Sequence, residues 1–134
     1  MPVVSPTGNR GAYKLYIRFS HTVRLNVGAL GSLSLAPGTY VYTGSAKRGL
    51  RQRVERHRRL AKTKQGRCHW HIDQLLLHPD SRLVRTELFA DGDECELSRQ
   101  LAVRTDVSIP VHGFGATDCK SGCKAHLYRL EKAK

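Results

Sequence analysis

Four side chains that can bind anions or move protons occur in the N-terminal half of the chain. Arg53 and His57 are four residues apart in a stretch that predicts a helix, so they lie on the same helical face. Tyr13 and Tyr42 lie on two predicted strands, and the second strand leads through Gly44 to that helix. We expect the two phenols, the guanidinium and the imidazole to converge, where they could bind an oxyanion and exchange protons.

The elements that would position these side chains begin with strands. Residues 12–19 and residues 39–43 are rich in aromatic and β-branched residues and predict two strands. Between them, residues 22–27 and 32–35 alternate apolar with polar residues, which indicates a hairpin. The second strand is expected to end at Gly44. The two tyrosines therefore lie on strands that are separated by an inserted hairpin.

Helices dominate the pattern in the middle of the chain. Helices are predicted over residues 49–61, over residues 69–78 and from Asp93, as the cap, to about Val103. Residues 82–90 predict a strand, and residues 126–130 predict a last strand at the edge of the sheet. This order predicts the α+β class, with a small, mainly antiparallel central sheet flanked by helices.

Length and charge suggest the kind of partner. The 134 residues suit one domain over residues 1–134, in which residues 1–10 form a loose arm. The 23 Lys and Arg outnumber the 11 Asp and Glu, which gives a formal net charge of +12. This excess favours a polyanion, because binding to phosphates releases condensed counterions. Nucleic acid is therefore the expected partner.

Membranes and secretion fit the sequence less well. No lipidation motif or long amphipathic helix supports binding to a membrane surface. The longest apolar runs are too short to span a bilayer, and the N-terminus lacks the basic start and apolar stretch of a secretory signal. We therefore expect no membrane partner and a cytoplasmic protein.

Positive charge is concentrated on and before the predicted helix of residues 49–61. Contacts to phosphates position a nucleic acid without reading its sequence. We expect this surface to bind the nucleic-acid backbone, and a solvated charged helix face is the alternative. The residues concerned are Lys47, Arg48, Arg51, Arg56, Arg58 and Arg59.

Two tripeptides and a helical motif resemble the GIY-YIG endonuclease superfamily. Gly11-Ala12-Tyr13 stands where the family has its first tripeptide, and Tyr42-Thr43-Gly44 stands where it has its second. Leu50-x-x-Arg53-x-x-x-His57 matches the family's helix. The sequence departs from the family's pattern at the middle position of each tripeptide, where it has Ala12 and Thr43. The segment between the tripeptides is also longer than in the family, and the inserted hairpin explains the extra length. The resemblance implies the fold of this superfamily and a nuclease activity.

Three further stretches resemble the uncharacterised Uri-type branch of small nucleases within that superfamily. They extend the resemblance over nearly the whole chain. They are His69-Trp70-His71-Ile72-Asp73, His112-Gly113-Phe114-Gly115 leading to Asp118-Cys119, and Ala125-His126-Leu127.

The resemblance implies one divalent metal ion, Mg²⁺ or Mn²⁺, held by a single glutamate. The helix that begins at Asp93 carries Glu94, which we favour, and Glu96, which is the alternative. A hard cation that keeps several waters suits one carboxylate together with a substrate phosphate.

The resemblance also assigns roles in catalysis. Arg53 would stabilise charge that develops on the phosphoryl oxygens. Tyr13 would take a proton from the attacking water, with Tyr42 orienting the water or the metal shell and His57 relaying the proton. His69 would reach the phosphate. Tyrosines that are simply half-buried on strands are the alternative interpretation of Tyr13 and Tyr42.

These roles describe a hydrolase that cleaves phosphodiester bonds inside a nucleic acid, with DNA favoured over RNA. Repair or processing is the expected context, and a repair protein is a further candidate partner. The alternative is a catalytically silent nucleic-acid-binding module of the same fold.

The C-terminal cysteines raise the question of a second metal. Cys119, Cys123 and His126 have a spacing compatible with three zinc ligands, and His112 or Cys95 could supply a fourth. We favour packed or free thiols over a structural zinc site, because no second ligand pair is recognised.

Overall fold

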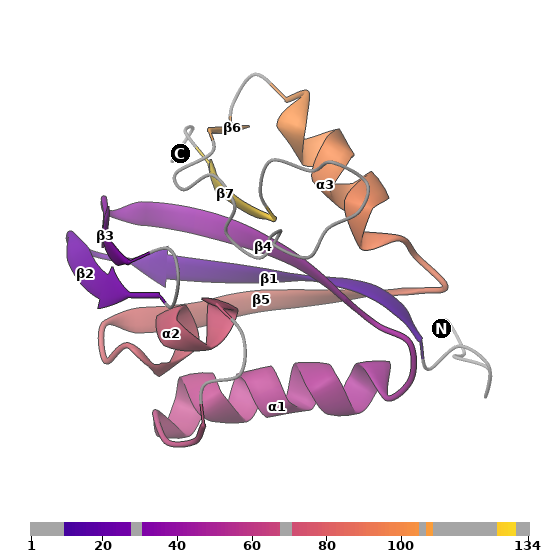
Figure 1. Cartoon of the computed structure of the whole chain (residues 1–134), viewed down its shortest axis with the longest axis horizontal. Helices are drawn as coiled ribbons and strands as arrows, with labels where there is room; N and C mark the ends of the chain where they lie inside the picture. The colour runs from indigo at the N-terminus through magenta and orange to yellow at the C-terminus, as the bar shows by residue number, and fades with distance from the viewer. Residues whose placement is uncertain (1–9, 28–30, 68–70, 105–106, 109–125, 131–134) are drawn as a thin grey trace.

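The middle layer of the molecule is a five-stranded antiparallel sheet in the order β5-β1-β4-β7-β6 (Figure 1). The computed structural model describes residues 10–27, 31–67, 71–104, 107–108 and 126–130. The sheet strands are β1 (Gly11–Phe19), β4 (Gly38–Ala46), β5 (Ser81–Ala90), β6 (Val107–Ser108) and β7 (Leu127–Leu130). The strands that carry Tyr13 and Tyr42 are therefore direct neighbours.

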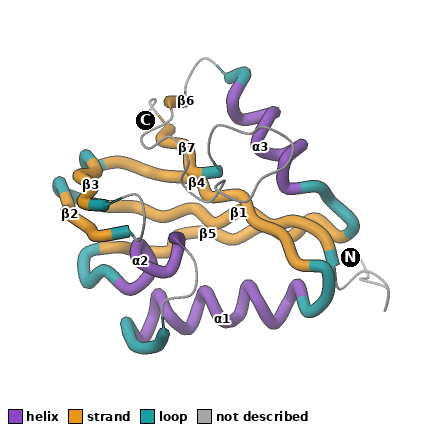
Figure 2. The backbone as a smooth tube through the Cα atoms, in the orientation of Figure 1, coloured by secondary structure: helices purple, strands orange, loops and turns teal. Residues whose placement is uncertain are grey.

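Two helices and a hairpin cover one face of the sheet, and a third helix lies over the other face (Figure 2). The first group is α1 (Leu50–Thr63), α2 (His71–Leu77), β2 (Val23–Asn26) and β3 (Ser32–Leu35), of which β2 and β3 form their own two-stranded sheet. The helix on the other face is α3 (Glu94–Ala102). The arrangement is a three-layer α+β fold.

The main core lies between the sheet and α1. Alternate residues of β1 from Tyr13 to Phe19 point into it, because successive side chains of a strand face opposite sides. Leu50, Val54 and Leu60 meet them from the inward stripe of α1. Burying each of these aliphatic side chains contributes about 2 kcal/mol, so this contact fixes where α1 lies on the sheet.

A smaller core fixes α3 to the opposite face. Val41 of β4, Leu101 of α3 and Tyr128 of β7 form it. The hydroxyl groups of Ser98 and Tyr128 are also in contact. The helix begins at Glu94, because the side chain of Asp93 caps it by accepting a hydrogen bond of 3.0 Å from the backbone N–H of Cys95.

One sheet edge, formed by β5, contains a bulge. Tyr16 pairs with Arg85 and Ile17 pairs with Leu83, so Val84 is the extra residue. The bulge leaves the side chain of Val84 54% exposed. It falls in the half of β5 that lies beside the C-terminal part of α1.

The structure confirms the predicted fold class. The antiparallel central sheet, the flanking helices and the hairpin between the two tyrosine-bearing strands are all present. Asp93 caps the third helix as predicted.

Two predictions about strands were wrong, one about where a strand ends and one about which strand forms an edge of the sheet. The strand predicted for residues 39–43 continues to Ala46, because Gly44 pairs with Tyr13 in β1 and does not break the ladder. The predicted strand at residues 126–130 is not an edge strand, because β6 pairs with its outer side. With two residues, β6 is too short to leave a pattern in the sequence.

Some expected segments lie largely or wholly outside the described residues. These are the loose arm of residues 1–10, of which only Arg10 is described, and the start of the helix predicted over residues 69–78. Among the helices that the structure describes, none is long and apolar enough to cross a membrane.

Candidate active site

Four elements meet where β4 ends and α1 begins. Nη1 of Arg53 in α1 donates a hydrogen bond of 2.9 Å to the backbone oxygen of Ser45 in β4. The hydroxyl group of Ser45 donates to Oε1 of Glu94, at the first position of α3. Nδ1 of His126, which directly precedes β7, lies 2.6 Å from Oε2 of Glu94. The Glu94 carboxylate thus accepts a hydrogen bond from Ser45 at one oxygen and lies close to the imidazole of His126 at the other, without hydrogen-bond geometry there.

Tyr13 of β1 and His57 of α1 form a buried pair near the end of β4. The phenol oxygen of Tyr13 lies 2.9 Å from Nε2 of His57, within hydrogen-bond distance. The ring of Tyr42 lies beside that of Tyr13, with 6.3 Å between the ring centres. Asp73 of α2 faces the other nitrogen of the imidazole, with 3.9 Å between its Oδ1 and Nδ1 of His57. The predicted convergence of Tyr13, Tyr42 and His57 is thus visible in the structure.

Burial controls the protonation of this group. Loss of hydration raises the pKa of Tyr13 well above its usual value, although the positive charge of Arg53 opposes the rise. Burial likewise raises the pKa of Tyr42. It lowers the pKa of His57 to about 4, against the opposing effect of Asp73. Both phenols and a neutral imidazole are therefore the expected forms at neutral pH.

The two motif glycines have a packing role. A Cβ atom on Gly44 would lie 2.4 Å from the phenol oxygen of Tyr13, so only glycine leaves room for that ring. Gly11 has a φ of +141°, and a Cβ atom there would lie 2.2 Å from the backbone oxygen of Phe89. These glycines allow β1 to pass close to its two neighbours, and this requirement holds with or without catalysis.

A cleft of ≈ 630 Å³ opens beside Glu94. Its lining includes Ser45 and Lys47 from one side and the stretch from Asp91 to Cys95 from the other. Asp91 is already bound to Arg10, at 2.9 Å, and Asp93 caps α3. Glu94 is the acidic residue of the lining whose partner, Ser45, also accepts a hydrogen bond from Arg53.

Glu96 occupies a different place. It does not line the cleft, and its carboxylate lies on the surface of α3, where Arg99 and Gln100 donate to it. Glu94 is thus the glutamate that the structure brings to the other candidate site residues.

The chemistry of the cleft fits a hard divalent cation. Glu94 supplies carboxylate oxygens and its side chain is 22% exposed, so a cation with several bound waters can reach it. Among the described residues, no group of three or more His, Cys, Asp or Glu side chains could hold a metal ion. The residues present therefore suit a cation bound by one carboxylate, and not a cage built from protein ligands alone.

The basic residues around α1 do not form one surface. Arg56 turns toward α2, where its guanidinium donates two hydrogen bonds of 3.2 Å to the buried carboxylate of Asp73. Arg58 turns toward β5 and donates to Thr86 at 2.6 Å. The remaining residues of the predicted backbone-binding set, namely Lys47, Arg48, Arg51 and Arg59, are exposed.

Part of the predicted set cannot be placed. His69, Cys119 and Cys123 lie outside the described residues. Among the described residues near His126, Sγ of Cys95 lies 4.0 Å from its Nε2 atom, and Glu94 contacts its Nδ1 atom. The preference for packed or free thiols over a structural zinc site therefore stays a prediction.

Sequence patterns gave little notice of two residues. Ser45 belongs to the site because its backbone and hydroxyl groups contact Arg53 and Glu94. Asp73, the last residue of the stretch that begins at His69, faces His57 and Arg56. A signal for Asp73 existed: it follows Ile72 and precedes Leu75-Leu76 in a short helix, so it is a carboxylate on an inward face.

The structure is that of a small α+β protein in which Glu94 lines a cleft and contacts Ser45, the residue that also accepts from Arg53. The chain belongs to the family described as domain of unknown function DUF123, whose profile matches residues 12–134. No curated protein and no solved structure matches it.

Proposed function

We propose that the chain is a metal-dependent endonuclease of the GIY-YIG type, from its Uri-type branch, that hydrolyses phosphodiester bonds in DNA. Repair or processing in the cytoplasm is the proposed context. The observation that carries the proposal is the convergence of Arg53 and Glu94 on Ser45, next to the Tyr13–His57 pair. A cation from α1 and a carboxylate from α3 thereby contact the same residue, Ser45, which lines the cleft, on a chain of net charge +12.

Tyr13 and His57 would act together as the proton acceptor. Asp73 favours the His57 tautomer with its proton on Nδ1, which leaves Nε2 to accept the phenol proton of Tyr13. As the water oxygen bonds to phosphorus and the bond to the leaving oxygen breaks, the water proton passes to Tyr13 and the phenol proton passes to His57. A neutral imidazole is required for this transfer, and burial keeps His57 neutral.

Arg53 and Glu94 would bind the reacting group. The guanidinium of Arg53 stabilises the negative charge on the phosphoryl oxygens. Glu94 would hold Mg²⁺ or Mn²⁺, and that ion, when bound, supplies charge stabilisation at the leaving oxygen. Ser45 and His126 keep the Glu94 carboxylate directed at the cleft, as partners of a metal ligand commonly do.

The test is cleavage of labelled single-stranded, duplex and branched DNA in the presence of Mg²⁺ or Mn²⁺. Arg53→Ala and Glu94→Gln are each expected to lower kcat by about 10²-fold or more, because each removes charge stabilisation of the transition state. Glu96→Gln and Arg24→Ala are the matched controls. If Arg53→Ala and Glu94→Gln cut as fast as the controls, the proposed site is wrong.

The second candidate is a catalytically silent nucleic-acid-binding module, and one observation favours it. Tyr13 is 3% exposed and Tyr42 is 7% exposed, so neither phenol is open to a substrate as the chain stands. Binding of all DNA forms with no cleavage under either metal would support this candidate over the endonuclease.

A further inference from the structure

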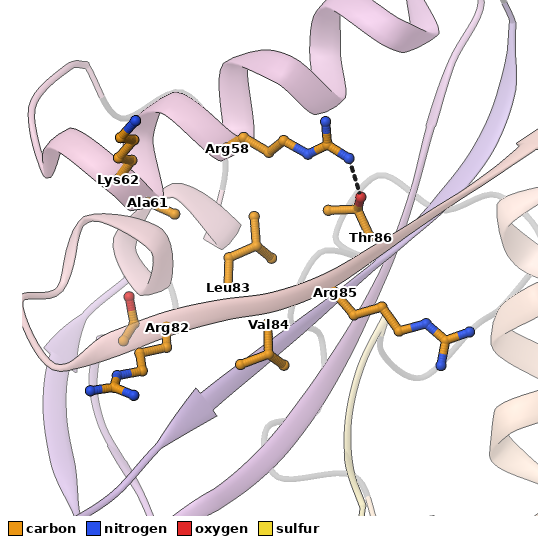
Figure 3. Close-up of a pocket in the computed structure, with 9 residues that line it drawn as sticks. Arg58, Ala61, Lys62, Arg82, Leu83, Val84, Arg85 and Thr86 are labelled. Atoms are coloured by element: carbon orange, nitrogen blue, oxygen red, sulfur yellow. Dashed lines mark hydrogen bonds between the residues drawn. The ribbon is translucent and has the colours of Figure 1, made fainter.

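A groove of ≈ 580 Å³ lies between the C-terminal part of α1 and the first half of β5 (Figure 3). Lys62 and Arg58 border it from α1, and Arg82 and Arg85 border it from β5. Leu83 and Thr86 project from β5 toward α1, whereas Val84 and Arg82 project from the other side of the strand (Figure 3). The groove therefore follows the open edge of β5.

The charged residues that line this groove are all basic, and one of them, Arg85, is paired at 2.7 Å with Glu87, which lies outside the lining. Lys62 and Arg82 are exposed, and the groove lining contains no Asp or Glu. Arg82 also pairs directly with Arg18 across β5 and β1. Like charges directly opposite each other destabilise a sheet, so this pair has a cost in the unbound protein that a bound anion would remove.

The groove leads to the candidate active site. A second hollow of ≈ 450 Å³, which shares Arg58 with the groove, continues along α1 past Arg51 and along β5 to Leu88. The cleft at Glu94 follows, where Lys47 precedes α1 and Asp91 follows β5. The acidic member of the second hollow, Glu55, is paired with Arg58 at 3.5 Å. Two elements that run side by side thus connect the groove to the cleft.

We infer that the α1–β5 groove binds the sugar–phosphate backbone of the DNA strand that extends away from the cleavage site. This inference rests on the proposed function, because it assigns the path of the same substrate. The 14 residues of α1 span roughly 21 Å at 1.5 Å per residue. A DNA strand advances about 3.4 Å per nucleotide, so the groove contacts phosphates about six nucleotides from the cleft.

The test measures binding of fluorescent single strands of about 3 and about 12 nucleotides by anisotropy, with EDTA present so that no strand is cut; only the longer strand can span the distance. The double variant Lys62→Gln/Arg82→Gln is compared with Arg24→Gln, an exposed arginine of β2 that lies off the groove. The double variant should bind the longer strand about tenfold more weakly and lose most of the affinity advantage of length. Its salt slope should fall by about 1.4, at 0.7 for each phosphate contact.

Conservative exchange tests the chemistry of the contacts. Lys62→Arg and Arg82→Lys are expected to bind within about twofold of the wild type, because a phosphate contact requires charge and not a particular base-reading geometry. Loss of binding in these variants would overturn the inference, since it would indicate a structural role for the side chains.

The outcomes separate the groove from the nuclease. If the double variant binds the longer strand like Arg24→Gln while the wild type cuts DNA, the groove inference is wrong and the endonuclease remains. If the wild type cuts nothing while the double variant loses its length-dependent binding, the groove inference holds and the endonuclease is wrong.

Discussion

At the scale of single residues, the burial of His57 bears on its proposed role in proton transfer and on the stability of the fold. Burial keeps the imidazole neutral, and a neutral imidazole could accept a proton from Tyr13 in the proposed reaction. The charged or titratable groups that face it are Tyr13, Asp73 and the two guanidinium groups of Arg53 and Arg56. Protonation of the imidazole at acid pH is therefore opposed by the nearby positive charges of Arg53 and Arg56 and favoured by Asp73.

The stability of the fold should therefore depend on His57 below neutral pH. Its pKa is lowered from about 6.5 to about 4, so the unfolded state takes up a proton first as the pH falls. The stability contribution is complete above pH 6.5 and is lost as the pH falls toward 4. We expect a loss of about 2 kcal/mol in the free energy of unfolding between pH 7 and pH 5, from the linkage relation.

Urea denaturation of the wild type and of His57→Gln at both pH values measures this effect. Glutamine does not titrate, so the variant should show a smaller change between pH 7 and pH 5 than the wild type. An equal change in both proteins would mean that His57 is not the group responsible.

At the scale of elements, the pair of Arg56 and Asp73 holds α1 and α2 together. Asp73 is fully buried, and the guanidinium of Arg56 is its bidentate partner. Such a pair adds little compared with an apolar contact, but removal of one partner leaves an uncompensated buried charge. The role of Arg56 is therefore structural, in contrast to its exposed neighbours on the same helix.

We expect Arg56→Gln to lower the free energy of unfolding by about 3 kcal/mol. Arg59→Gln removes the same charge from the exposed face of the same helix and should change stability by less than about 0.5 kcal/mol. Urea denaturation compares the two. A similar stability for both variants would show that the Asp73 contact has no structural weight.

The sequence predicted elements better than their ends and contacts. Long periodic segments such as β1 and α1 were predictable, because one face of each is buried and repeats at the period of its element. Gly44 was interpreted as the end of a strand, but its absence of a side chain serves the ring of Tyr13 and the strand continues. Such a role depends on the neighbouring strand, which a local pattern does not contain.

The candidate site likewise contains residues that the sequence predicted and contacts that it did not. Tyr13, Tyr42, Arg53 and His57 were predictable, because two strands and one helical spacing bring them together. Ser45 and His126 were not predictable as contacts of Glu94, since they come from separate elements whose meeting depends on the register of β4 with β1 and β7. The sequence likewise did not predict that Arg56 turns toward Asp73 and away from the other basic residues of α1, because this contact depends on how α2 packs.

At the scale of the whole molecule, acidic and basic side chains are concentrated in different places. The carboxylates of Asp91, Asp93 and Glu94 gather at the cleft, and exposed Lys and Arg residues border the surface that leads away from it. A cation and a polyanion would thus be drawn to different ends of one continuous path. In the proposed function, the net charge of +12 would favour association with the polyanion, and the local carboxylates would offset its repulsion of a metal ion at the cleft.

The open edge of β5 has a consequence for colloidal behaviour. A ten-residue edge strand exposes backbone groups that a second copy could pair with, and proteins prevent such pairing with charged side chains and bulges. We therefore expect Arg82, Arg85 and the bulge at Val84 to disfavour pairing between copies of this chain. Replacing both arginines with threonine should promote self-association, measurable as a rise in apparent mass by light scattering, and added oligonucleotide should not reverse it.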